Sequence, residues 1–209
     1  MDITQLLNSG LGQQIINGIG GQVGTSEKET SSVISASLPV ILGMLQKNAT
    51  SEEGASGIMN ALNKHDGGIL DNLSGFLNSG DTTDGNGILG HILGGKKGNV
   101  ENAISKQTGV SSFDVSKIIA MLAPIVMGYL GRQTKNENVT SGSGLGGVLG
   151  GLLGNAGGAS SVGGSILTSM LDQDGDGQLG VGDVLSAVKK KKKKSGGLGG
   201  LLGSIFGKK

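Results

Sequence analysis

The chain has 209 residues, 43 of them glycine, and it contains no cysteine and no tryptophan. This length suits one or two small domains, and the lack of cysteine excludes disulfides, cysteine nucleophiles and cysteine-ligated zinc. The formal net charge of +1 is unevenly distributed, because residues 1–188 carry 9 Lys or Arg against 16 Asp or Glu, a net charge of −7, whereas residues 189–209 carry 8 Lys and no acid, a net charge of +8.

The first residues do not predict an ordinary signal peptide. Residues 1–20 have neither the basic segment nor the continuous apolar segment of a signal peptide. The longest apolar stretch, residues 118–130, is too short to span a bilayer. The sequence therefore predicts no transmembrane helix, and either a cytoplasmic location or export by a non-classical route.

Two segments of the chain resemble each other. Residues 13–47 align with residues 98–132 at a constant offset of 85, and 10 of the 35 aligned positions are identical. The identical pairs are Asn17 and Asn102, Ile19 and Ile104, Gln22 and Gln107, Gly24 and Gly109, Ser26 and Ser111, Ser31 and Ser116, Ile34 and Ile119, Pro39 and Pro124, Gly43 and Gly128, and Leu45 and Leu130. This pattern predicts an internal repeat.

Each repeat unit is predicted to form a helix, a tight glycine turn and a longer helix. In the second unit Gly109 ends the first helix, and Ser111 or Ser112 caps the next. The second helix is apolar nearly all round from Ile118 onward, which is typical of a buried helix, and Pro124 is expected to kink it. Between the units, shorter amphipathic helices are predicted over residues 55–64, 68–77 and 87–93, with a turn over residues 81–87.

The paired segments LPVILGML (38–45) and APIVMGYL (123–130), together with ILGHILGG (88–95), carry a family resemblance. They resemble the YidB-like family of bacterial proteins of unknown function, over about residues 1–155. The resemblance implies a small, all-helical, homeodomain-like fold and no assigned catalytic residues. We therefore predict an all-α body over residues 1–132, followed by a Gly/Ser-rich linker over residues 133–160 in which residues 145–153 form a short helix.

A calcium site is predicted within residues 161–190. Residues 172–183 read DQDGDGQLGVGD and fit an EF-hand loop, with Gly177 at the position of the sharp turn. Three aspartates on alternate residues bring three carboxylates together, and Ca²⁺ prefers such oxygen ligands. The predicted ligands, at loop positions 1, 3, 5, 7 and 12, are Asp172, Asp174, Asp176, Gln178 through its backbone carbonyl, and Asp183.

The last ligand of this loop differs from the usual one. Asp183 stands where most EF-hands have Glu, and its shorter side chain reaches the ion less easily. Aspartate at this position resembles the loops of dockerin modules, which carry two loops, whereas this chain shows one. A single loop predicts weak binding, with a Kd of about 10⁻⁴ to 10⁻³ M.

The C-terminal tail, residues 191–209, is predicted to be basic and amphipathic. It begins within the lysine run 189–194 and so contains the last four lysines of that run. Its apolar residues are Leu198, Leu201, Leu202, Ile205 and Phe206. This combination suits an anionic membrane surface or an acidic protein partner. A solvated, solubilising tail has the same composition.

Three short motifs point to other functions, and their chemistry argues against each. Residues 103–119 resemble a helix-turn-helix, but the second helix offers only Lys117 to phosphates, so nucleic-acid binding is not favoured. GHILGGKK (90–97) matches a phosphate-binding loop but has Lys97 where Ser or Thr is needed. The two histidines, His65 and His91, lack a partner at metal-ligand spacing.

These features favour a non-enzymatic, calcium-binding accessory or assembly module of a bacterial protein. One alternative is an exported cargo or effector with a membrane-active tail. The other is a weak nucleic-acid binder that uses the helix-turn-helix-like unit.

Overall fold

Every regular element in the described part of the chain is a helix. The computed structural model describes residues 8–155 and Ile166, and the chain divides into two compact units, Met1–Leu167 and Thr168–Lys209. All described residues belong to the first unit, and they contain no strand. The all-α prediction is thus confirmed for this part of the chain, whereas its homeodomain-like character stays a prediction.

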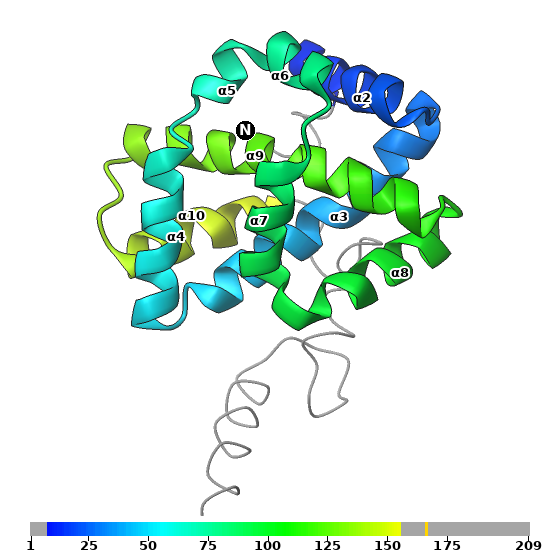
Figure 1. Ribbon diagram of the computed structural model, residues 1–209. Coiled ribbons are helices and arrows are strands. Elements are labelled where there is room, and N and C mark those ends of the chain that lie inside the picture. The colour runs from blue at the N-terminus through cyan, green and yellow to red at the C-terminus, as the bar shows by residue number, and fades with distance from the viewer. Residues whose placement is uncertain (1–7, 156–165, 167–209) are drawn as a thin grey trace, which may run out of the picture. The chain divides into compact units, whose positions relative to one another are not determined.

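The helices follow one another with short connections (Figure 1). In chain order they are α2 (Gly10–Val23), α3 (Glu27–Asn48), α4 (Glu52–Lys64), α5 (Gly68–Asp71), α6 (Leu73–Ser79), α7 (Thr83–Leu93), the 3₁₀ helix η1 (Gly94–Lys96), α8 (Lys97–Thr108), α9 (Ser112–Asn136) and α10 (Gly142–Asn155).

Helices α3 and α9 form the centre of the unit. Figure 1 shows them side by side, with α2, α5 and α6 along one side of α9 and α4, α7 and α8 in front. Most of their apolar residues are buried, and Ile34, Ile118 and Met121 have exposures of 1% or less. The apolar run after Ile118 therefore forms the core, as its pattern predicts.

The turns before α3 and α9 are built alike. Gly24 and Gly109 end the preceding helices with φ of 85° and 77°, in the left-handed region that favours glycine. Ser26 and Ser111 then cap the next helix, and each accepts a hydrogen bond from the backbone N–H three residues on. Pro39 and Pro124 both lie inside the central helices.

The predicted helices between the repeat units are present with different boundaries. Helix 55–64 begins earlier, at Glu52, because Ser51 caps it. The predicted helix 68–77 is divided into α5 and α6 at Asn72. The predicted turn over 81–87 is wrong from Thr83 onward, because the Asp81 carboxylate accepts the Thr83 N–H at 2.8 Å and α7 begins at Thr83.

Helix α9 bears on the prediction that no helix spans a membrane. By length and composition alone α9 is long and apolar enough to cross one, but most of its apolar stretch is buried in the protein. It packs against α2, α3, α7 and α8. This is the environment of a core helix.

Part of the predicted linker is helical. α9 continues to Asn136, and α10 occupies residues 142–155, a longer helix than the predicted 145–153. Leu145 and Leu149 are wholly buried, and α10 packs on α3 and α4. The predicted calcium module, apart from the buried helical residue Ile166, and the whole predicted tail lie outside the described residues.

Candidate binding groove

The predicted calcium ligands lie outside the part of the chain that the structure describes. They are Asp172, Asp174, Asp176, Gln178 and Asp183. Within residues 8–155, no three His, Asp or Glu side chains come close enough together to hold a metal ion. The candidate site in the described residues is a groove on the surface of the helical body.

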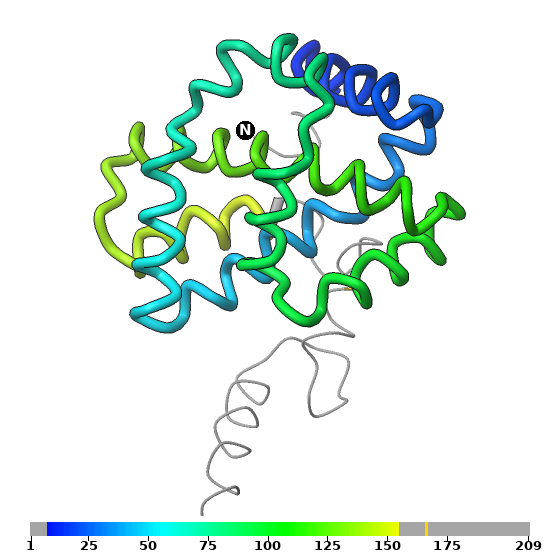
Figure 2. The backbone as a smooth tube through the Cα atoms, viewed as in Figure 1, coloured from blue at the N-terminus to red at the C-terminus, as the bar shows by residue number. Residues whose placement is uncertain are grey.

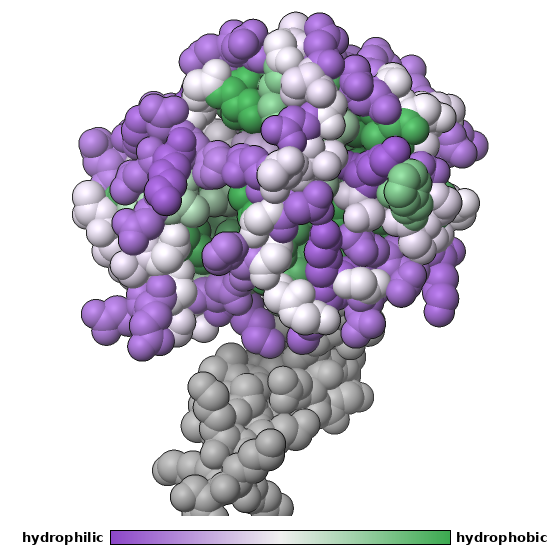
Figure 3. Space-filling model, in the orientation of Figure 1, coloured by the Kyte–Doolittle hydropathy of each residue, from purple (hydrophilic) through white to green (hydrophobic). Residues whose placement is uncertain are grey.

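The groove lies between α4 and α7 and has a volume of about 850 Å³. In Figure 3 a strip of apolar surface is visible where α4 and α7 flank it. Its lining residues fall on one face of each flanking helix, with α3 and α9 beneath. They are Leu45, Asn48, Ser51, Gly54, Gly57, Ile58, Asn60, Ala61, Lys64, His65, Thr83, Asp84, Gly87, Ile88, His91, Ile92 and Met127.

The two flanking helices run in opposite directions, as the chain path in Figure 2 shows. At one end of the groove, His65 at the end of α4 faces Asp84 in the first turn of α7, with 3.8 Å between Nδ1 and Oδ2. At the other end, Asn48 donates a hydrogen bond from Nδ2 to the Ile92 carbonyl at 3.1 Å. The first contact joins the end of α4 to α7, and the second joins the end of α3 to α7.

The floor of the groove is apolar. Leu45 of α3 and Met127 of α9 lie at its base, and isoleucines from α4 and α7 line its lower sides. A volume of this size falls in the range of ligand-binding sites, and the polar side chains that line the groove surround this apolar base. Methionine also adapts its shape to a bound group.

The walls of the groove carry small residues. Gly57 of α4 and Gly87 of α7 both line it, and a Cβ built on either glycine would meet no heavy atom within 4 Å outside its own helix and chain neighbours. Ala61 follows Gly57 one turn later on the same wall. The walls therefore leave space that larger side chains would fill.

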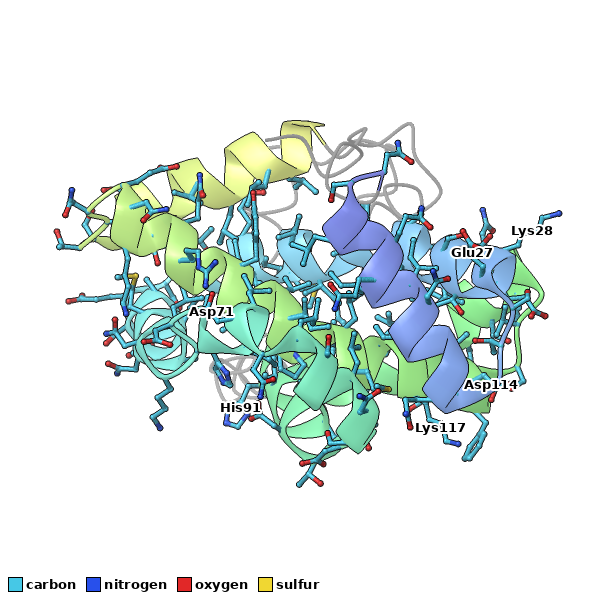
Figure 4. The ribbon with its side chains drawn as sticks, turned by 90° about the horizontal axis from the view of Figure 1, so that it is seen from above. Glu27, Lys28, Asp71, His91, Asp114 and Lys117 are labelled. Carbon is cyan, nitrogen blue, oxygen red and sulfur yellow. The ribbon has the colours of Figure 1, made fainter. Side chains whose placement is uncertain are left out.

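His91 is held in one orientation at the rim. Its Nδ1 lies 2.8 Å from the Gly87 carbonyl oxygen. Because a carbonyl oxygen only accepts, Nδ1 carries the proton in the neutral ring, and Nε2 is left as an acceptor. In Figure 4 His91 and Asp71 lie left of the centre of the view, whereas Asp114 and Lys117, at the start of α9, lie on the right.

The loop that carries His65 is fastened to the end of α9. Arg132 donates from Nη2 to the Gly67 carbonyl at 2.9 Å and to Asp71 Oδ1 at 2.6 Å. Lys135 forms an ion pair with Asp66 at 3.1 Å. The only arginine of the chain thus positions one end of the groove.

These contacts predict a dependence of stability on acid. The Lys135 ammonium and the Gly68 N–H both hold the pKa of Asp66 below its ordinary value of 3.8. Because the folded-state pKa is lowered, the stabilisation is present above the ordinary pKa and is lost as the pH falls through the folded-state value. We expect the melting temperature of the wild type to fall more steeply than that of Asp66→Asn below about pH 4. Parallel curves from thermal denaturation across this range would contradict the assignment.

The helix-turn-helix-like segment is placed with its second helix mainly in the core. From Ile118 to Gly128 each residue of α9 is buried, and its exposed residues lie in the first turn and at the C-terminal end. Near the start of α9 the Lys117 ammonium lies 4.3 Å from the ring centre of Phe113, which is 68% exposed. Lys97, in the segment that matches a phosphate-binding loop, begins α8 and donates to Asn86 Oδ1 at 2.7 Å.

The groove could not be found from sequence. The sequence gives neither histidine a partner at metal-ligand spacing, and the structure brings both to one groove from two separate helices. The one available signal is the spacing of Gly54, Gly57 and Ala61, which places small residues on a single face of α4.

In the residues that the structure describes, the chain is all-helical and has a concave groove between two antiparallel helices. The chain belongs to the DUF937 family of bacterial proteins of unknown function, whose family profile matches residues 5–133. No curated protein and no solved structure matches the chain.

Proposed function

We propose that the protein is a non-enzymatic accessory or assembly module that binds a partner segment in the α4–α7 groove and Ca²⁺ in the loop 172–183. The groove carries the first half of this proposal, because it combines an apolar floor with small-residue walls and a polar rim. The second half rests on the sequence of the loop, with Asp172, Asp174 and Asp176 as the main ligands.

The groove can be tested with single cysteines, because the chain has none of its own. A photo-crosslinker attached to Gly57→Cys or Gly87→Cys stands in the groove. The same label on Gly90→Cys stands on α7 but outside it. We expect one defined adduct from both groove positions in cells and none from position 90. Equal adducts at all three positions, or none, would contradict a binding role for the groove.

We also propose that the chain is a YidB-like member of its family and that its two repeat units are structurally equivalent. The matched glycine caps, serine caps and prolines of α2–α3 and α8–α9 support this. If the units are equivalent, Ser26→Ala and Ser111→Ala should each lower the free energy of unfolding by about 1 kcal/mol. Denaturant titration measures both losses, and a large loss in only one variant would show that the caps differ.

A second candidate function is a membrane-directed one, favoured by the charge of −7 in residues 1–188 against +8 in residues 189–209. Near anionic lipid each lysine contributes about 1 kcal/mol to the free energy of membrane binding. The apolar residues from Leu198 to Phe206 can insert between the lipids. We expect the full chain to bind anionic vesicles at low salt far more than a 1–188 truncation does. Equal co-sedimentation of the two would argue against this role.

A further inference from the structure

Lys64 lies at the end of the groove where α4 ends and α7 begins, and it is exposed. Within the described residues, no hydrogen bond or ion pair joins its ammonium to another side chain. A cation at the rim of an apolar groove is a point where a bound partner can be recognised by an opposite charge.

The acidic side chains near this end are already engaged. Asp66 pairs with Lys135 and Asp71 with Arg132. Asp84, the one carboxylate that lines the groove, faces His65. A bound partner that carries a carboxylate would therefore supply the ion pair that the described body does not give Lys64.

The dimensions of the groove suit a short helix. α4 has 13 residues and α7 has 11, so at 1.5 Å per residue the walls extend for about 16–20 Å, or about three helical turns. Gly57, Ala61 and Gly87 line the walls, and small residues allow the axes of two helices to approach closely. The floor is then within reach of apolar side chains at positions i, i+4 and i+7 of an occupant.

We propose that the groove binds an amphipathic helix of a partner protein, with apolar side chains on the floor and an Asp or Glu at the end that meets Lys64. This assignment rests on the proposed function and adds the chemistry of the partner. The acidic residue fixes the direction of the bound helix, because Lys64 stands at only one end of the groove.

The test uses a phage-displayed library of 14-residue helical peptides with a fixed leucine stripe and flanking positions varied among Glu, Lys and Ser. Peptides selected on the wild-type protein are synthesised and titrated by fluorescence anisotropy. The protein variants are Gly57→Leu and Gly87→Leu, which fill the groove, Gly90→Leu as the matched control on α7, and Lys64→Ala. None of the three glycines has a neighbouring atom that an added Cβ would strike, and circular dichroism checks that each variant folds.

We expect selected peptides to carry Glu near one end. Their binding should weaken about tenfold or more in Gly57→Leu and Gly87→Leu, about three- to fivefold in Lys64→Ala, and remain unchanged in Gly90→Leu. Peptides that are blocked by the groove variants but carry Lys or Ser would overturn the acidic partner and leave the proposed groove function standing. If no selected peptide is affected by the groove variants, both the partner and the groove function are overturned.

Discussion

Gly85→Ala is expected to destabilise the protein more than any other glycine-to-alanine change in α7. A Cβ at this position would overlap the carbonyl oxygen of Ala120 in α9, which is backbone and cannot move aside as a side chain can. Overpacking of this kind costs about 3 kcal/mol. Thermal denaturation should show a fall in melting temperature of about 10 °C for a unit of this size.

The same Ala120 carbonyl lies where α7 approaches α9 closely. Pro124 has no N–H and therefore leaves the carbonyl of Ala120, four residues earlier, without its helical donor. Gly85 presents its Cα to that oxygen, a contact of the weak Cα–H···O type. The glycine thus meets a backbone group that the proline has left without its helical hydrogen bond.

Gly90→Ala is the control for this change. Gly90 lies in the same helix, is exposed, and has no atom within 4 Å of an added Cβ. Alanine there should raise the free energy of unfolding by about 0.5–1 kcal/mol, because alanine favours the helix over glycine. Equal melting temperatures for Gly85→Ala and Gly90→Ala would show that α7 does not meet α9 in this way.

Asp172→Ala combined with Asp176→Ala is expected to abolish saturable Ca²⁺ binding. These residues supply two of the three alternate carboxylates of the loop, and without them the remaining oxygens carry too little charge to hold the ion. Isothermal titration calorimetry of the wild type should show one site with a Kd of about 10⁻⁴ to 10⁻³ M. Saturable binding that persists in the double variant would remove the loop as the site.

The effect of Ca²⁺ on stability provides a second measurement. A ligand at ten times its Kd adds about 1.4 kcal/mol to the unit that binds it. The loop lies in the unit Thr168–Lys209, whereas α2–α10 lie in the other. If the two units unfold separately, melting followed through the helices of the body should change little when Ca²⁺ is added.

The local features of the fold follow from the sequence, whereas the groove does not. Gly109 and Ser111 end and begin helices as their residue types dictate, because the left-handed conformation and the side-chain cap are decided within a few residues. The apolar run of α9 likewise identifies a buried helix. Each of these depends on neighbours in the chain.

The groove depends instead on contacts between distant residues. Arg132 reaches Gly67 and Asp71 across 65 and 61 residues of sequence, and no spacing rule indicates that pairing. The start of α7 is missed because Asp81 and Thr83 suit a turn and a helix start equally well, and only the placement of α7 against α9 decides between them.

Helix α10 belongs to the folded unit but lies outside the part of the chain that the family profile matches. The family match ends at residue 133, nine residues before α10 begins. Yet Leu145 and Leu149 are wholly buried in a helix that packs on α3, so a fragment cut at the edge of the family match would leave a side of its own central helix uncovered. Expression boundaries for this chain are therefore better drawn beyond Asn155 than at the limit of recognisable similarity.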